Sequence, residues 1–99
     1  MKLVVVGLNH KTAPVDVRER VAIPSEGIRE ALLFLKRYVS SGAILCTCNR
    51  TEVYAAGEDV ARSSQSIVRF LADSHRLSPE AFASHLYTYE DEGTVRHLS

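Results

Sequence analysis

The chain has 99 residues, of which 45 % are apolar and 24 % are charged. This length and composition suit one compact folded domain and exclude a complete dinucleotide-binding fold beside it. Because 12 Lys and Arg balance 12 Asp and Glu, the chain lacks the overall basic excess of dedicated nucleic-acid binders. A local basic patch could still be formed by the early cations Lys11, Arg18, Arg20 and Arg50.

The predicted compartment is the cytoplasm. No apolar run approaches the roughly 20 residues that a membrane-spanning helix needs. The apolar run at residues 3–6 is shorter than the core of a signal peptide. The chain has two cysteines, Cys46 and Cys48. In a reducing cytosol, such thiols are kept for packing or chemistry rather than for a disulfide.

The chain begins with a predicted strand followed by two predicted helices. The β-branched run at residues 3–6 is typical of a buried strand, and polar and proline residues at 7–14 predict a loop. A short helix is expected over residues 15–22. A longer amphipathic helix follows, with Ser25 as its candidate N-cap and an apolar stripe over residues 28–39.

The middle of the chain predicts a hairpin and a further helix. Residues 43–45 and 51–56 are expected to be strands, and residues 46–50 are expected to form the tight connection between them. A longer helix is expected to open at residues 57–59. Its buried side is predicted to carry Val60, Ile67, Val68 and Leu71.

The last third predicts a short helix over residues 78–85, a fourth strand over residues 86–89 and a helix that starts at residues 91–93. The resulting order, βαββαβ with extra short helices, predicts a ferredoxin-like α+β fold. In that fold an antiparallel sheet has helices on one face. Another small α+β sandwich is the alternative.

Cys48 is the first candidate for chemistry. It is predicted to enter a tight turn beside Thr47, Asn49 and Arg50. A thiolate is the reactive form of cysteine, and a nearby positive charge such as that of Arg50 stabilises it. Thr47 and Asn49 could donate hydrogen bonds to a substrate. Taken alone, however, a cysteine near a strand end is more often a small core residue, so both interpretations stay open here.

The other candidates carry weaker signals. Cys46 follows an apolar strand, which favours packing over a Cys-x-Cys metal or redox site, because metal sites need more ligands at recognisable spacing. Arg50 could bind a carboxylate or pair with Glu52. His97 could transfer a proton near neutral pH or lie on a helix surface. No glycine-rich phosphate-binding motif occurs in the sequence, so we predict neither a metal nor a nucleotide site in this chain.

Three segments resemble the glutamyl-tRNA reductase family: residues 7–20 (GLNHKTAPVDVRER), residues 47–54 (TCNRTEVY) and residues 89–98. The resemblance spans essentially all 99 residues, with the three blocks in the family's order, and the block TCNRTE is the most specific. Members of this family have a catalytic domain, an NADPH-binding domain and a helical dimerisation domain. The resemblance implies that residues 1–99 are the catalytic, glutamyl-binding domain, truncated at its C-terminal end, without the other two domains.

The resemblance also implies roles for single residues. Cys48 corresponds to the family's nucleophile, whose thiolate attacks glutamyl-tRNA and leaves a thioester. NADPH then reduces this thioester to glutamate-1-semialdehyde for tetrapyrrole (porphyrin and haem) biosynthesis. Arg50 matches the residue that recognises the glutamyl group, and Thr47 and Asn49 belong to the same substrate-binding stretch. His97 matches a histidine implicated in catalysis. The family usually has Ser where this chain has Cys46.

The implied cofactor is NADPH, held by a domain that this chain lacks, with no metal. The implied partners are glutamyl-tRNA, a second copy of the full-length enzyme bound through its C-terminal domain, and the aminomutase that acts next in the pathway. We expect the site to gather at one end of the sheet. Residues of the loop after the first strand could line it: Asn9, His10, Lys11 and Thr12.

Two other functions remain open from the sequence. A thiol switch would use Cys46 and Cys48 equally, and its oxidation would link them. A ferredoxin-like RNA-binding module would bind uncharged RNA with a steep salt dependence and would not need Cys48. The enzyme hypothesis differs from both because it requires Cys48 alone.

Overall fold

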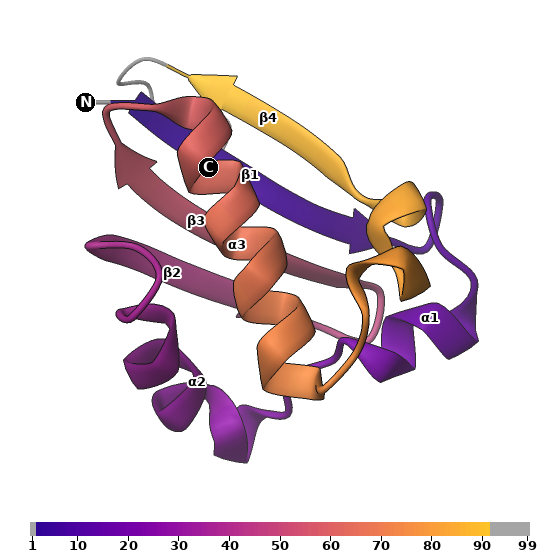
Figure 1. The fold of residues 1–99 in the computed structure, drawn as a ribbon. Helices are drawn as coiled ribbons and strands as arrows, with labels where there is room; N and C mark the ends of the chain where they lie inside the picture. The colour runs from indigo at the N-terminus through magenta and orange to yellow at the C-terminus, as the bar shows by residue number, and fades with distance from the viewer. Residues whose placement is uncertain (1, 92–99) are drawn as a thin grey trace.

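A computed structural model describes residues 2–91 of the chain, so the predicted role of His97 and the predicted helix that starts at residues 91–93 fall outside the described residues or at their edge. The elements, labelled in Figure 1, are β1 Lys2–Asn9, α1 Val15–Arg20, α2 Ile28–Leu35, β2 Ser41–Cys46, β3 Arg50–Gly57, α3 Val60–His75 and β4 Tyr87–Asp91. Three short 3₁₀ turns accompany them: Ser25–Gly27, Pro79–Ala81 and Ala83–His85.

The four strands form one antiparallel sheet in the order β2-β3-β1-β4. The mixed α/β architecture with a four-stranded antiparallel sheet, predicted from the element order, is therefore confirmed. β1 lies in the interior of the sheet and pairs with β3 on one side and with β4 on the other. This central position matches its sequence, because a β-branched run at residues 3–6 suits a strand with neighbours on both sides.

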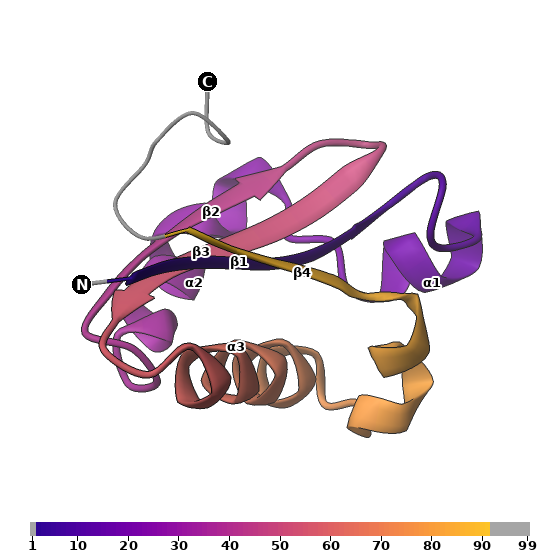
Figure 2. The same cartoon turned by 90° about the horizontal axis from the view of Figure 1, so that it is seen from above.

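One face of the sheet carries the hydrophobic core. Alternate residues of a strand point to opposite faces, so Val4, Val6 and Leu8 of β1 share one face, and all three are buried in the core. In Figure 2, which looks along the sheet edge, α3 lies against the sheet on one side. The core between them includes Ile67, Phe70 and Leu71 of α3 and Leu35 of α2.

β1 extends further than its sequence predicted. Residues 7–9 were expected to begin a loop, but they pair with residues 50–52 of β3 and belong to the strand. Gly7, the first residue of the predicted loop, lies inside the strand. A Cβ at Gly7 would lie 2.5 Å from the carbonyl oxygen of Thr51, so the residue is needed for a close approach inside the sheet.

The helix boundaries also differ from prediction. Ser25 does not cap α2: it opens a 3₁₀ turn without a side-chain capping bond, and its hydroxyl contacts Glu26 instead. α2 ends at Leu35, several residues before the end of the apolar stripe. Ser41 and Gly42, which follow the predicted stripe, begin β2. Gly42 suits this place because a Cβ there would meet Leu35 Cδ2 at 2.8 Å.

The segment predicted as one short helix over residues 78–85 forms two 3₁₀ turns. Between them Phe82 has a φ of −141°, outside the helical range, and its side chain is buried in the core. Burial of this ring therefore interrupts the helix that the Ser-Pro-Glu start favours. Within residues 2–91, no helix has the length and apolar character needed to cross a membrane.

Candidate functional site

The loop after β1 and the turn between β2 and β3 lie together at one end of the sheet. Asn9 and Arg50 form the last pair of the β1–β3 ladder, so the segments that follow Asn9 and precede Arg50 leave the sheet side by side. They enclose an open hollow whose polar lining is Asn9, His10, Lys11, Thr47, Asn49 and Arg50. The structure thus brings together the two segments that the sequence predicted to form the site.

The loop after β1 is held in shape by its own polar side chains. Asn9 Oδ1 accepts hydrogen bonds from the backbone N–H groups of Lys11 (2.8 Å) and Thr12 (3.1 Å), and Thr12 Oγ1 accepts from Asn9 N (3.0 Å). His85 adds a long-range support, with Nδ1 3.0 Å from the Thr12 carbonyl oxygen. Asn9 and Thr12 therefore build the loop, while His10 and Lys11 are exposed at its tip.

The turn at residues 47–50 is organised around Thr47. Its hydroxyl oxygen accepts the backbone N–H groups of Asn49 and Arg50, both at 3.2 Å, and its own N–H donates to the Arg50 carbonyl at 2.8 Å. A hydroxyl that satisfies turn N–H groups fixes the backbone locally. Cys48 lies within this fixed turn and is exposed to solvent.

The two cysteines have different surroundings. Cys46 is half-buried and packs against the core. Its sulfur accepts the backbone N–H of Ile23 at 3.3 Å and lies 3.4 Å from the Thr51 hydroxyl oxygen. Cys48 is exposed, and both thiols are free. The expectation that Cys46 is the more buried, packing cysteine is confirmed. No group of three metal-ligating side chains occurs among residues 2–91.

Arg50 lies next to a buried carboxylate. Its Nη1 is 3.8 Å from Glu52 Oε1, and the Arg50 side chain is 52 % exposed. Glu52 also accepts hydrogen bonds from two tyrosine hydroxyls, Tyr54 on Oε1 at 2.7 Å and Tyr87 on Oε2 at 2.6 Å. The pairing of Arg50 with Glu52 was one of the two sequence interpretations, and the exposed guanidinium leaves the other, binding of an external carboxylate, available.

Burial raises the pKa of both tyrosines, and the hydrogen bonds to Glu52 raise it further. The pKa of Tyr54 rises from 10.0 to about 12, and that of Tyr87 rises as well. Both hydroxyls therefore stay protonated and donate to the carboxylate at neutral pH. Sequence reasoning missed this cluster because Tyr87 comes from β4, far along the chain. A glutamate in the middle of a strand was the available signal.

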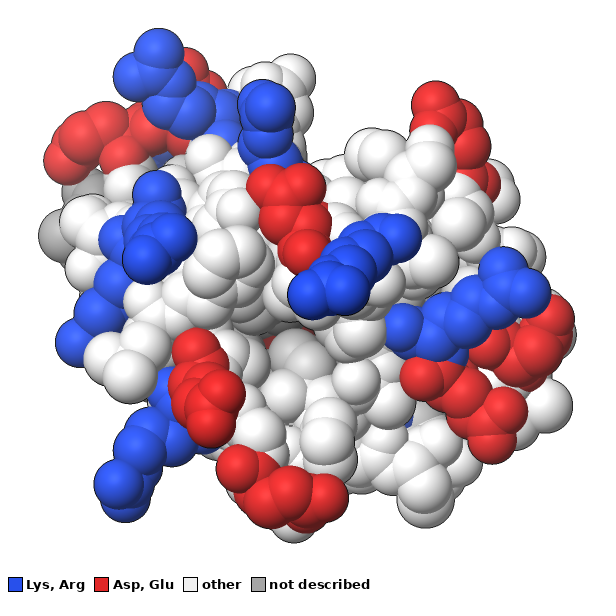
Figure 3. All heavy atoms as spheres, turned by 60° about the horizontal axis from the view of Figure 1, so that its bottom comes forward, with Lys and Arg blue, Asp and Glu red and all other residues white. Residues whose placement is uncertain are grey.

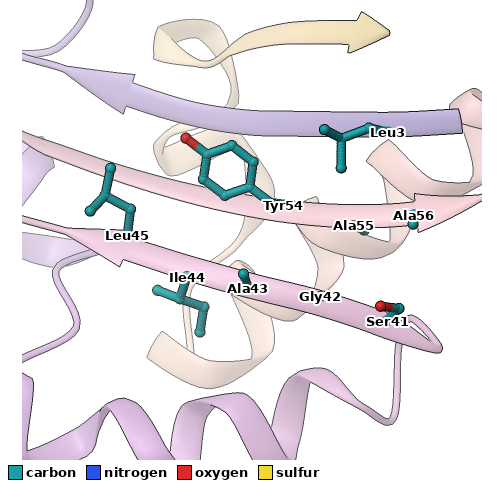
Figure 4. A pocket seen from close by; sticks show the side chains of 9 residues that line it. All are labelled: Leu3, Ser41, Gly42, Ala43, Ile44, Leu45, Tyr54, Ala55 and Ala56. Carbon is teal, nitrogen blue, oxygen red and sulfur yellow. The ribbon is translucent and has the colours of Figure 1, made fainter. Parts of the chain in front are cut away.

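The face of the sheet opposite the core has a shallow, mainly apolar hollow (Figure 4). The Tyr54 ring lies between Leu45 and Leu3 in this view, on strands β3, β2 and β1. On the surface seen in Figure 3, Lys and Arg side chains are interspersed with Asp and Glu. That surface therefore has no continuous basic patch of the kind a general RNA-binding module presents.

Comparison with known proteins gives a consistent picture. The sequence profile of the family described as "Glutamyl-tRNAGlu reductase, N-terminal domain" matches residues 6–99. The chain is 47 % identical over 100 residues to the glutamyl-tRNA reductase of Pelobacter propionicus, covering 99 % of this chain and 23 % of that protein. It is 46 % identical over 99 residues to that of Magnetococcus marinus, covering 98 % of this chain and 24 % of that protein.

The glutamyl-tRNA reductase of Geobacter metallireducens is 44 % identical over 100 residues, again with 99 % of this chain and 23 % of that protein covered. The chain thus spans about a quarter of the length of the curated relatives it matches. The matched region includes every residue of the loop after β1 and of the turn at residues 47–50.

Proposed function

The chain belongs to the family of glutamyl-tRNA reductase N-terminal domains, and on that premise we propose that it is the glutamyl-binding, thiol-bearing domain of an NADPH-dependent reductase. The full-length enzyme would act on glutamyl-tRNA and supply glutamate-1-semialdehyde for tetrapyrrole synthesis. The observation that carries the proposal is the exposed Cys48 in a fixed turn whose last residue, Arg50, lines a polar hollow. The proposed nucleophile and the proposed carboxylate-binding cation thereby lie in one short segment.

In the proposed reaction, the Cys48 thiolate attacks the ester carbonyl carbon that joins glutamate to the terminal ribose of the tRNA. A carbon–sulfur bond forms, the carbon–oxygen bond to the ribose breaks, and the departing ribose oxygen takes up one proton. The product is a glutamyl thioester on Cys48, with no change of oxidation state. Splitting one difficult conversion into two steps in this way is the usual advantage of covalent catalysis.

Arg50 is proposed to receive the side-chain carboxylate of the glutamyl group. A guanidinium carries five N–H donors, and a half-exposed one that faces the hollow can form a bidentate pair with a carboxylate. Thr47 is proposed to act mainly by holding the turn, because its hydroxyl oxygen already accepts two backbone N–H groups. Asn49 and the loop-tip residues His10 and Lys11 line the same hollow and are proposed to contact substrate.

The described residues do not fit NADPH. The longest helix, α3, opens at Asp59, whose carboxylate accepts the backbone N–H of Arg62 at 3.1 Å. A negative charge that already occupies this N-terminus disfavours a phosphate there. We therefore assign NADPH binding and reduction of the thioester to the rest of the longer enzyme. The catalytic role that the resemblance implies for His97 is likewise a proposal.

We also propose that the domain has the ferredoxin-like arrangement. The strand order β2-β3-β1-β4 supports it, together with helices that follow β1 and β3. Dimerisation through a C-terminal domain, transfer of the product to the next enzyme of the pathway and a cytoplasmic location are proposed from the family resemblance.

The test is to incubate the protein with glutamyl-tRNA, quench it in acid and analyse it by mass spectrometry. We expect a glutamyl adduct on Cys48, no adduct in Cys48→Ser and an undiminished adduct in the matched variant Cys46→Ser. An adduct on Cys46, or equal loss in both variants, would contradict the assignment. With NADPH added, the 99-residue chain should yield no glutamate-1-semialdehyde, whereas the full-length enzyme should.

A further inference from the structure

Glu52 of β3 lies opposite Gly7, a position at which β1 has no side chain. Gly7 pairs with Glu52 of β3 on one side and with Tyr87 of β4 on the other. A Cβ at Gly7 would be only 2.8 Å from Glu52 Cγ. The missing side chain therefore lets the Glu52 carboxylate lie across β1, on the sheet face opposite the core. It also lets Tyr87 reach that carboxylate from a strand that is not adjacent to β3.

The two carboxylate oxygens of Glu52 have separate partners. Tyr54 donates to Oε1 at 2.7 Å and Tyr87 donates to Oε2 at 2.6 Å. Two hydroxyl donors on a buried carboxylate restrict its rotation and stabilise its charge. The carboxylate is thus fixed from two strands, β3 and β4, and the Glu52 side chain is 11 % exposed.

Arg50 is the third partner of Glu52 and the one that reaches the hollow. Its Nη1 lies 3.8 Å from Oε1 of the fixed carboxylate. Its side chain is also part of the lining of the hollow between the β1 loop and the β2–β3 turn. A long arginine side chain has several rotatable bonds, and a fixed counter-charge limits the directions it can take.

We propose that the Tyr54–Glu52–Tyr87 cluster is a positioning device that orients the Arg50 guanidinium toward the side-chain carboxylate of the substrate. This inference rests on the proposed function and deepens it, because it makes the two tyrosines specificity determinants. The full-length enzyme should then distinguish glutamyl-tRNA from glutaminyl-tRNA, which carries a neutral amide at the same position, partly through groups that never touch the substrate.

The test uses the full-length enzyme with Tyr54→Phe, Tyr87→Phe and the matched control Tyr89→Phe, a 57 % exposed tyrosine on the same strand as Tyr87. Steady-state kinetics give kcat and KM for glutamyl-tRNA, and glutaminyl-tRNA serves as a competitive inhibitor. Loss of one hydrogen bond to the charged Glu52 should raise KM for glutamyl-tRNA by roughly three- to tenfold with little change in kcat. The inhibition constant of glutaminyl-tRNA should stay the same, and Tyr89→Phe should resemble the wild type.

A double-mutant cycle separates positioning from a purely structural role. If the tyrosines act through Arg50, Tyr87→Phe should cause no further loss of discrimination in an Arg50→Lys background. Glu52→Gln, which keeps the side-chain volume and removes the charge, should reproduce the loss of discrimination. Equal weakening of both tRNAs, or full additivity with Arg50→Lys, would overturn the inference. Cys48→Ser tests the proposed function separately, since its retention of activity would refute that function whatever the tyrosine variants do.

Discussion

The two faces of the sheet use the same strands for different purposes. The face under α3 is built from aliphatic and aromatic side chains, and Val6, Val53 and Phe70 there are each 0 % exposed. The opposite face carries Tyr54, Glu52, Tyr87 and small residues around a shallow hollow. Alternation along each strand thus gives one face to the hydrophobic core, while the other face carries the Glu52 hydrogen bonds beside a mainly apolar hollow.

The difference between the faces indicates which substitutions should change folding stability and which should change the candidate site. On the core face, free energy comes from removing apolar area from water. On the opposite face, a carboxylate is held by hydroxyl donors beside a half-exposed arginine. Each interaction there contributes little to folding, but it sets the orientation of a group at the candidate site. Substitutions on the two faces should therefore separate stability from function.

The largest expected effect is truncation on the core face. Phe70 is fully buried and its ring packs against Phe34 and Tyr38, with centroids 5.9 Å from each. Phe70→Ala should lower the free energy of unfolding by about 3–5 kcal/mol. Tyr89→Ala, on the opposite face and 57 % exposed, should cost less than about 1 kcal/mol. Urea denaturation followed by circular dichroism measures both free energies of unfolding. A similar loss of stability in the two variants would contradict the proposed difference between the faces.

The second expected effect is the loss of stability on substitution of Gly7, where an added side chain would disturb both the β1–β3 backbone pairing and the Glu52 side chain. A Cβ there would be 2.5 Å from the Thr51 carbonyl oxygen and 2.8 Å from Glu52 Cγ. Gly7→Ala should cost about 1–3 kcal/mol because strand and carboxylate must shift. Gly27→Ala is the control, since the nearest atom to its added Cβ would be 3.7 Å away in Pro24. A Gly7→Ala variant as stable as Gly27→Ala would show that the sheet adapts.

The sequence predicted the strands better than it predicted their ends. Strands at residues 3–6 and 51–56, the hairpin between residues 43 and 56 and the helix with Ile67 and Leu71 on its buried side were all found. Hydrophobic patterns identify these elements because burial drives them. The ends escaped prediction because they depend on pairing: residues 7–9 are strand only because residues 50–52 of β3 lie opposite.

The turn of the candidate site was predictable because its residues are near each other in sequence. The segment alone left open whether Cys48 is a core residue, and the structure shows it exposed. The expectation that the loop after β1 lies nearby came from the family resemblance, and the two segments do line one hollow. The contact of Tyr87 with Glu52 was not predicted, since it depends on β4 pairing with β1 at Gly7. Long-range register of this kind has no local sequence signal.

A smaller effect should appear at alkaline pH. Burial, and then the bond to Glu52, raise the pKa of Tyr54 from 10.0 to about 12, while Arg50 lowers it slightly; the pKa of Tyr87 rises in the same way. The stability that Tyr54 contributes is therefore fully present below pH 10 and is lost as pH rises from 10 to about 12. The loss should be on the order of 1 kcal/mol, because solvent screens a partly exposed group.

Ultraviolet titration of tyrosinate tests this directly. Tyr54→Phe should remove one late-titrating tyrosine and flatten the fall in stability above pH 10. If neither Tyr54→Phe nor Tyr87→Phe reduced the amplitude of the late phase, the hydrogen bonds to Glu52 would be excluded as its origin.

The last expected effect is of similar size but opposite sign, and it concerns Arg18 on α1. Its Nε and Nη1 are buried without a hydrogen-bond partner, on a helix whose Val17 belongs to the core. A buried donor without a partner costs stability, so Arg18→Met should raise the free energy of unfolding by about 1 kcal/mol by keeping the apolar stem and removing the guanidinium. Arg20→Met, exposed on the same helix, is the control and should change stability by less than about 0.5 kcal/mol. Urea denaturation of the 99-residue chain measures both variants. A loss of stability in Arg18→Met would mean that the Arg18 guanidinium has a stabilising partner in solution.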